Sequence, residues 1–211
     1  MGIQIIAHRG LWSKLNEQNT YEAFNKSLTN KFGIETDIRD FCGELVISHD
    51  IPKDNVFFLK DFFYLYLKLK STEILALNIK SDGLQKQLKI ILEEFNILNY
   101  FVFDMSMPDL INYKKYFISF YTRLSEYEKE PIFISESNGI WIDCFANDFS
   151  DYEKLKSLIL ENKSLCFVSP ELHGRDYIDF WKKLKFNYNN KNVFLCTDHP
   201  FEARIFFNEN D

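Results

Sequence analysis

Residues 33–50 read GIETDIRDFCGELVISHD and give the first indication of the fold. The run 34–38 (IETDI) is short and apolar apart from its acidic residues, which is typical of a buried strand. A second strand-like run, 44–49 (ELVISH), follows after only a few residues. We therefore expect a strand and a hairpin-like return directly after it.

Similar runs recur on both sides of this hairpin. They are short and almost continuously apolar, as expected for parallel strands that are buried on both faces. Strands are expected at 3–7, 34–38, 74–79, 100–103, 118–121, 139–142, 165–168 and 193–196. Helical spacing of apolar residues predicts helices at 20–32, 59–70, 83–95, 107–116, 151–162, 176–186 and 200–207. Pro131 interrupts 123–138, so a helix there should be short or absent.

Eight strands that alternate with helices predict the α/β class, as a compact (β/α)8 barrel of the TIM type. The run 44–49 is then an extra hairpin strand after strand two. With 211 residues, the chain suits one domain, which we place at 1–211.

The composition restricts the class of partner. A net charge of −6 provides no general attraction to nucleic acid or to anionic membranes. No apolar run approaches the length of a membrane span, and we expect no signal peptide. The four cysteines are widely spaced and form no C-x-x-C pair, which predicts a reduced, cytoplasmic protein. The oligomeric state is left open.

Polar side chains stand at the end of nearly every expected strand, where the active sites of such barrels lie. They are His8 and Arg9, Glu35 and Asp37, Asn78 and Lys80, Asp104, Arg123, Asp143, Glu171 with His173, and Asp198. Because the pattern repeats from strand to strand, we interpret it as one functional rim rather than as scattered surface charge.

Glu35 and Asp37 are two residues apart, so both project from the same face of a strand. Paired carboxylates form a hard-oxygen site that suits Mg²⁺ or Ca²⁺. The alternative is that they cap a helix or pair with Arg39. His8 and His49 could act as general base and general acid, since an imidazole side chain can exchange protons near the working pH, although a single histidine is more often structural.

Two cationic residues accompany these groups. The guanidinium of Arg9 can bind phosphate oxygens with two parallel hydrogen bonds. Lys80 adds a second positive charge. Together these residues indicate metal-assisted cleavage of a phosphodiester.

Four motifs carry a family resemblance: AHRG at 7–10, N-T-x-x-A-F at 19–24, G-x-E-x-D at 33–37 and S-H-D at 48–50. In this order they resemble the glycerophosphodiester phosphodiesterase family, within the superfamily of phospholipase-C-like phosphodiesterases. The resemblance implies a (β/α)8 barrel in which His8 and His49 are the acid–base pair. It also implies that Arg9 binds phosphate and that a carboxylate-bound divalent cation is the cofactor. A neighbouring hydroxyl of the substrate would attack first and give a cyclic phosphate.

The chain departs from the family pattern at three points. Gln18 stands where the family usually has Glu, and Asn78 stands where it has the third metal ligand. The expected metal ligands are therefore Glu35, Asp37 and Asn78, and the neutral amide should weaken cation binding. The insertion that usually follows the second histidine is also missing, which should leave the site more open.

The second half of the chain offers further candidates for substrate binding. Glu171 and His173 lie in a dense polar loop after strand seven, and Arg123 follows strand five. Loops after the last strands of such barrels often bind phosphate or hydroxyl groups. The alternative for each is a surface ion pair or a hydrogen bond within the loop. Asp143 is a further candidate cation ligand from strand six.

These observations predict a metal-dependent phosphodiesterase that acts on a small-molecule or glycan phosphodiester. One alternative is a non-catalytic barrel that binds a phosphate or sugar phosphate and has lost full metal binding. Gln18 and Asn78 favour this alternative, whereas the retained histidines oppose it. A lyase or isomerase that acts on sugar phosphates is a weaker third possibility.

Overall fold

The structure is a computed structural model that describes residues 2–148, 155–158, 162–188 and 191–208. The chain divides into two compact units. The first unit is Ala7–Phe120, and the second combines Met1–Ile6 with Tyr121–Asp211.

The first unit alternates strands and helices. Its strands are β1 (Gln4–His8, whose first residues belong to the second unit), β2 (Gly33–Phe41), β3 (Glu44–Ile47), β4 (Phe57–Phe58), β5 (Leu75–Ile79) and β6 (Tyr100–Phe103). Its helices are the 3₁₀ helix η1 (Leu15–Glu17) and the α-helices α1 (Tyr21–Thr29), α2 (Leu59–Lys68), α3 (Gln85–Glu94) and α4 (Met107–Lys115).

The expected hairpin forms around β2. Strand β3 pairs antiparallel with the end of β2, with Ile38 opposite Ile47. On its other edge β2 pairs parallel with β5, where Ile38 lies opposite Ile79, and β5 in turn pairs parallel with β6. All five residues of β5 are buried, which agrees with a strand covered on both faces.

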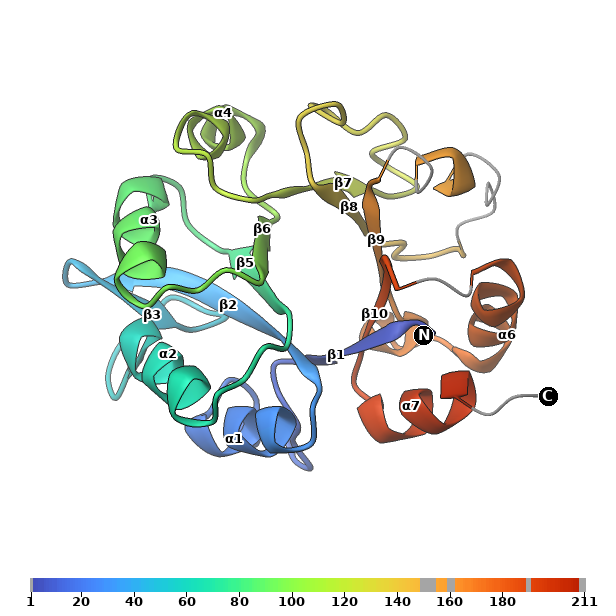
Figure 1. Cartoon of the computed structure of the whole chain (residues 1–211), viewed down its shortest axis with the longest axis horizontal. Helices are drawn as coiled ribbons and strands as arrows, with labels where there is room; N and C mark the ends of the chain where they lie inside the picture. The colour runs from blue at the N-terminus through green and yellow to red at the C-terminus, as the bar shows by residue number, and fades with distance from the viewer. Residues whose placement is uncertain (1, 149–154, 159–161, 189–190, 209–211) are drawn as a thin grey trace. The chain divides into compact units, whose positions relative to one another are not determined.

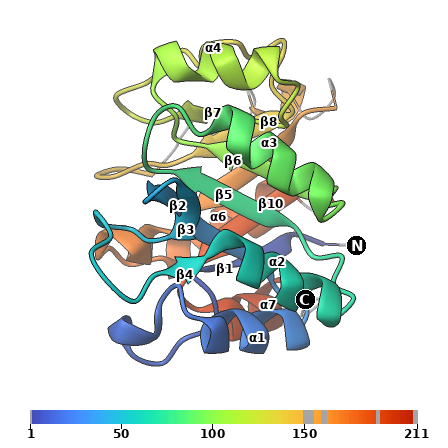
Figure 2. The same ribbon diagram turned by 90° about the vertical axis from the view of Figure 1, so that its left-hand side faces the viewer.

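Aromatic residues from the helices form the core of this unit. Figure 2 shows α2 and α3 on the near side, with β5 visible between them. Phe24 of α1 packs against Phe62 of α2 with a ring separation of 4.5 Å, and Phe63 packs against Phe95 at 5.8 Å. Part of the high phenylalanine content of the sequence is thus used to pack neighbouring helices against one another.

In the second unit the strands are β7 (Tyr121–Leu124), β8 (Gly139–Ile142), β9 (Ser164–Val168) and β10 (Val193–Thr197). They pair in parallel, in the order β7, β8, β9, β10 (Figure 1). The helices are the 3₁₀ helix η2 (Pro170–His173) and the α-helices α6 (Ile178–Asn187) and α7 (Pro200–Asn208).

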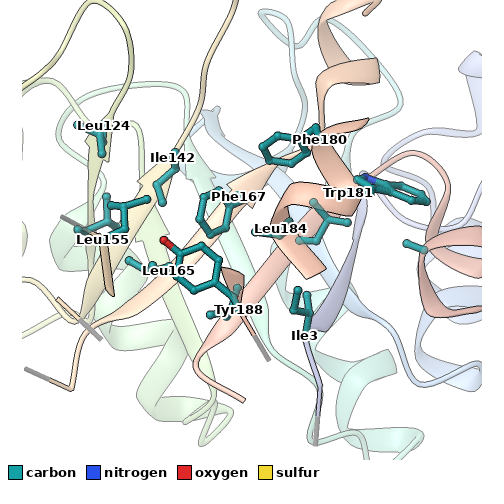
Figure 3. Packing of buried hydrophobic residues seen from close by; sticks show 14 residues of the cluster. Ile3, Leu124, Ile142, Leu155, Leu165, Phe167, Phe180, Trp181, Leu184 and Tyr188 are labelled. Atoms are coloured by element: carbon teal, nitrogen blue, oxygen red, sulfur yellow. The ribbon is translucent and has the colours of Figure 1, made fainter. Parts of the chain in front are cut away.

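Helix α6 supplies much of the core of the second unit. Figure 3 shows Trp181 and Leu184 of α6 together with Phe167 and Leu165 of β9. Trp181 is fully buried, and its indole Nε1 donates a 2.8 Å hydrogen bond to the hydroxyl of Ser169. The buried polar atom of this side chain is therefore satisfied.

One expected strand lies at different residues, and one short strand was not expected. The strand expected at 118–121 lies at Tyr121–Leu124, because Phe117 adopts a left-handed conformation (φ 54°) and Ile118 N–H donates to the carbonyl of Tyr113. These bonds close helix α4 in a Schellman motif. They involve Phe117 and Ile118, so Ile118 belongs to the end of the helix and not to the start of a strand. The two-residue strand β4 was not expected.

The remaining expectation concerns the helix at 151–162. Residues 155–158 are helical, and the rest of that range, apart from Asn162, lies outside the described residues. Among the described residues between β7 and β8 there is no helix, as the position of Pro131 predicted. No helix in the described part of the chain has the length and hydropathy that crossing a bilayer requires.

Candidate functional site

The acidic pair of β2 lies at the centre of the first unit. Glu35 and Asp37 alternate with Thr36, so their side chains share one face of the strand. Glu35 is 2% exposed and Asp37 is fully buried. Buried carboxylates require close partners, and these come from both neighbouring edges of β2.

Backbone hydrogen bonds bring two other segments to one edge of β2. Arg9 N–H donates to the carbonyl of Glu35 (3.0 Å), and Ser48 N–H donates to the carbonyl of Asp37 (3.0 Å). The bonds on the β5 edge use Ile34 and Ile38, and backbone groups alternate in direction along a strand, so the carbonyls of Glu35 and Asp37 face the opposite edge of β2. His8 and His49 therefore approach the carboxylates along the same edge.

The hairpin explains how His49 reaches this position. Strand β3 runs antiparallel to β2, so the chain after Ile47 passes back along β2 toward Asp37. A parallel strand would have carried these residues the other way. On the β5 edge, Asn78 is the direct neighbour of Asp37, and Lys80 N–H donates to the carbonyl of Ile38 (3.0 Å).

Asp37 is surrounded by donors. Its carboxylate lies 3.1 Å from Arg9 Nε and 3.3 Å from Lys80 Nζ. Asn19 Nδ2 donates a 2.8 Å hydrogen bond to Asp37 Oδ2. Two cations and an amide thus compensate the charge of a carboxylate that is shielded from water.

Glu35 is less well compensated. Its Oε2 accepts a 3.3 Å hydrogen bond from Arg9 N–H and lies 3.9 Å from His8 Nε2. Burial, followed by the negative charge of Asp37, raises the pKa of Glu35 to about 7. The charged form of Glu35 is thus disfavoured by its surroundings, and a cation beside this carboxylate would stabilise that form.

The loop after β1 aligns its polar side chains through two left-handed residues. Arg9 (φ 55°) and Asn19 (φ 56°) both adopt this conformation, and Asn19 N–H donates to the carbonyl of Arg9. Arg9 Nη1 donates to Gln18 Oε1 (3.2 Å), so Gln18 serves as a neutral acceptor where the family has Glu. Thr20 is the N-cap of α1 and accepts from Ala23 N–H at 3.2 Å.

Gly10 allows the loop after β1 to pack closely against the start of helix α1. Its φ is +87°, and a Cβ at this position would lie 2.9 Å from both the Cβ of Ala23 and the Cδ1 of Phe24. The backbone after Arg9 can therefore approach helix α1 only at a glycine.

Gly10→Ala is expected to lower the free energy of unfolding by roughly 3 kcal/mol, because left-handed strain and overpacking add. Gly83→Ala is the matched control, since Gly83 has φ +89° but open space where a Cβ would stand. The control should lose only about 1–2 kcal/mol. Urea unfolding of the two variants measures the difference, and equal losses would show that packing against α1 is unimportant.

His49 has a defined ring orientation. Its Nδ1 lies 2.8 Å from Asp50 Oδ1, and about half of its side chain is exposed. The hydrogen bond from His49 lowers the pKa of Asp50. A carboxylate on Nδ1 favours the tautomer that leaves Nε2 available for proton exchange.

Asn78 is held by a neighbour on the far side of β5. Its Nδ2 donates to Asp104 Oδ2 at 3.3 Å. Within the described part of the chain, Asn78 Oδ1 is buried without a hydrogen bond, and Asp37 Oδ1 has only its ion pair with Lys80. Two buried oxygens on paired residues, together with Glu35, form a donor set that fits a hard divalent cation.

The described residues hold no group of three or more His, Cys, Asp and Glu side chains suited to a metal ion. At the proposed site, Glu35 and Asp37 are accompanied by the neutral amide of Asn78, which is the partner of Asp37 on β5.

In the second unit the three candidate residues have separate partners. Arg123 lies within β7, not after a strand as expected, and forms an ion pair with Glu128. His173 Nε2 lies 2.6 Å from Asp143 Oδ1. Glu171 Oε1 accepts hydrogen bonds from the hydroxyl of Thr197 and from a backbone N–H, whereas its buried Oε2 has no hydrogen-bond partner among the described residues.

The structure thus brings together the candidate residues of the first unit around β2, which are His8, Arg9, Glu35, Asp37, His49, Asn78 and Lys80. Sequence reasoning did not assign a role to Asn19 or Asp104, which contact Asp37 and Asn78 directly. Asn19 lies inside the N-T-x-x-A-F motif, and Asp104 ends a strand, so both positions carried a signal.

Comparison with known proteins identifies the fold. The sequence matches no family model, and no curated protein matches it significantly. A structure from Galdieria sulphuraria, assigned to the glycerophosphodiester phosphodiesterases, superposes with a TM-score of 0.79 at 18% identity and covers 98% of both chains.

Two other structures extend this likeness. An Oleispira antarctica phosphodiesterase in complex with its product sn-glycerol-3-phosphate gives a TM-score of 0.71 at 14% identity and covers 99% of this chain and 98% of its own. A Ca²⁺-dependent phosphatidylinositol-specific phospholipase C from Streptomyces antibioticus gives 0.61 at 7% identity, with coverages of 98% and 96%.

The chain therefore has the fold of the glycerophosphodiester phosphodiesterases. The predicted α/β class and TIM-type architecture are confirmed, and the family resemblance seen in the motifs is confirmed at the level of the fold.

Proposed function

We propose that this protein is a phosphodiester hydrolase of the glycerophosphodiesterase type that depends on a divalent cation. The observation that carries the proposal is the convergence on three residues of β2. Arg9, Ser48 and Lys80 are each hydrogen-bonded through their backbone N–H groups to Glu35, Asp37 and Ile38. These bonds bring the segments that carry His8, Arg9, His49 and Lys80 to the two edges of β2, which supports the proposal.

Glu35, Asp37 and Asn78 would hold the cation, which suits Mg²⁺ or Ca²⁺ because all their free donor atoms are oxygens. When bound, the cation would polarise the phosphoryl group and neutralise developing negative charge. The neutral amide and the cations already on Asp37 should make this binding weak.

His8 and His49 would exchange the protons of the reaction. One imidazole takes a proton from the attacking hydroxyl or water, and the other donates a proton to the leaving oxygen. Asp50 orients His49 through Nδ1. Arg9 and Lys80 would bind the non-bridging phosphate oxygens. The Nη2 group of Arg9 suits this role, because the bonds of Arg9 to Asp37 and Gln18 use Nε and Nη1.

In the second unit, Arg123, Glu171 and His173 are proposed as substrate-binding residues. The buried, unpaired Oε2 of Glu171 supports this role, since such an atom can accept a bond from a substrate hydroxyl.

The proposed substrate is a small-molecule or glycan phosphodiester. The related Oleispira structure contains sn-glycerol-3-phosphate, which supports a glycerophosphodiester. The net charge of −6 opposes nucleic acid as a substrate. We also propose that the protein acts in the cytoplasm, on lipid-derived diesters.

The test is hydrolysis of bis(p-nitrophenyl) phosphate and of a panel of glycerophosphodiesters with Mg²⁺, Ca²⁺ or Mn²⁺. We expect turnover that EDTA abolishes and that excess cation restores. Phosphorus NMR of the product distinguishes a cyclic phosphate from a monoester. No cleavage of any diester with any of the three cations would overturn the proposal.

Asn78 and Gln18 favour a second candidate, a non-catalytic phosphate-binding barrel. Calorimetry with glycerol phosphate tests it. Binding without turnover of any diester would establish this alternative, and turnover would exclude it.

A further inference from the structure

We propose that Asp104 is a positioning residue that turns the amide oxygen of Asn78 toward the carboxylates of β2 and supplies the negative charge that Asn78 lacks. The inference rests on the proposed cation site. It assigns to two residues, on neighbouring strands, the task that one acidic ligand would otherwise perform.

Strand order gives the amide its direction. Strand β5 lies between β2 and β6, with Asn78 opposite Asp37 on one edge and opposite Phe103 on the other. Asn78 Nδ2 donates to Asp104, which follows directly after Phe103. The nitrogen and oxygen of a planar amide lie on opposite sides of Cγ. The bond toward β6 therefore turns Oδ1 toward β2 and Asp37.

The unpaired state of that oxygen agrees with this orientation. Among the described residues Asn78 Oδ1 is buried and accepts no hydrogen bond, while Asp37 Oδ1 has only its ion pair with Lys80. A buried acceptor without a hydrogen bond destabilises the folded protein. A cation between these strands would remove that cost.

Asp104 follows directly after Phe103, at the point where the chain leaves β6. Its φ is 66°, in the left-handed region, which Asp adopts more readily than most non-glycine residues. In this conformation its carboxylate lies beside the amide of Asn78.

Asp104 also adds a negative charge beside the neutral amide of Asn78. Glu35 and Asp37 provide two negative charges, and Asn78 provides none. A carboxylate that accepts a hydrogen bond from a ligand polarises that ligand and strengthens its donor oxygen. Asp104 therefore restores the third negative charge from one bond further away.

Four variants separate orientation from charge. D104N keeps an acceptor for Asn78 Nδ2 but removes the charge, and D104A removes both. N78D places a second carboxylate beside that of Asp104, where Asn78 Nδ2 now lies 3.3 Å from Asp104 Oδ2. The double variant N78D/D104N exchanges the two groups and restores one charge and one amide. D40N is the matched control, because Asp40 projects from the opposite face of β2 and bonds to Ser81.

The measurement is the Kd of Mn²⁺ and Ca²⁺ by calorimetry, with Mn²⁺ binding checked by electron paramagnetic resonance. We expect D104N to raise Kd about tenfold and D104A up to about 100-fold, the range for partners of metal ligands. N78D/D104N should bind at least as tightly as the wild type and more tightly than N78D. D40N should change Kd less than twofold.

The signal of the Asn78 side-chain NH₂ group in ¹⁵N-labelled, metal-free protein provides an independent readout. It should shift strongly in D104A and only weakly in D104N. Wild-type binding that D104A leaves unchanged would overturn this inference alone, whereas a wild-type protein that binds no divalent cation would overturn the proposed function with it.

Discussion

Replacing His8 with alanine should lower kcat/KM for a glycerophosphodiester by at least about 10³-fold, in the range for loss of a general acid or base. His8 ends β1 at the edge of the acidic pair, with Nε2 3.9 Å from Glu35. Its side chain is mostly buried but borders the site rather than the core. The melting temperature should therefore fall by only a few degrees.

His49→Ala should have a similarly large effect, because the two imidazoles perform complementary proton transfers. Asp50→Asn should be milder, about tenfold, since it removes only the group that orients Nδ1. KM should change little in these variants, because neither ring is proposed to bind the substrate's phosphate.

His199→Ala is the control for a general effect of removing an imidazole. Its ring packs on Tyr177 in the second unit at a centroid separation of 5.1 Å. This variant should keep at least half of the wild-type activity. If His8→Ala or His49→Ala retained more than a tenth of wild-type kcat/KM, the proposal that these two histidines form the acid–base pair would be wrong.

The strands of this protein could be predicted well because their burial is visible in the sequence. All the residues of β5 and β8 are buried, so a run that is apolar, except for Asn78 in β5, marks each strand to within one or two residues. The hairpin of β2 and β3 was predictable for the same reason. The shifted strand β7 is the exception, because Ile118 belongs to the end of helix α4.

The ends of helices α1 to α4 were predicted one to three residues too late, whereas those of α6 and α7 were predicted one residue too early. The helices α1 to α4 each end before a left-handed residue that is not glycine, and these are Lys31, Lys70, Asn96 and Phe117. The glycine that usually marks such an end is missing, so the apolar periodicity continued without a stop signal.

The candidate site could be predicted only in part. The carboxylates and histidines stand at strand ends, where topology alone brings them together. The contacts of Asn19 and Asp104 could not be predicted, because both depend on left-handed backbone conformations that a sequence pattern does not reveal. Arg123 was placed at the end of a strand because that strand was expected three residues too early.

The two carboxylates of β2 should respond in opposite directions when their charge is removed. In EDTA at pH 8, Glu35→Gln should raise the free energy of unfolding by up to about 3 kcal/mol. Asp37→Asn should lower it by about 2–3 kcal/mol, because Arg9 and Lys80 would lose the carboxylate that compensates their charges.

The direction for Glu35 follows from its raised pKa. Between pH 4.5 and about 7 the folded protein holds a proton that the unfolded chain has released. The unfolded state then binds fewer protons, so stability falls as the pH rises through this window and stays reduced above it. Glu35→Gln removes this loss. The variant and the wild type should therefore have nearly equal stability at pH 4.5 and differ most above pH 7.

Urea unfolding at pH 5 and pH 8, with EDTA throughout, measures both effects. Added Ca²⁺ should then stabilise the wild type and leave Glu35→Gln almost unchanged, because the variant lacks one of the proposed ligands. If Glu35→Gln instead destabilised the protein at pH 8 as much as Asp37→Asn, the charge of Glu35 would already be compensated by its neighbours. The electrostatic reason for a cation at this site would then disappear.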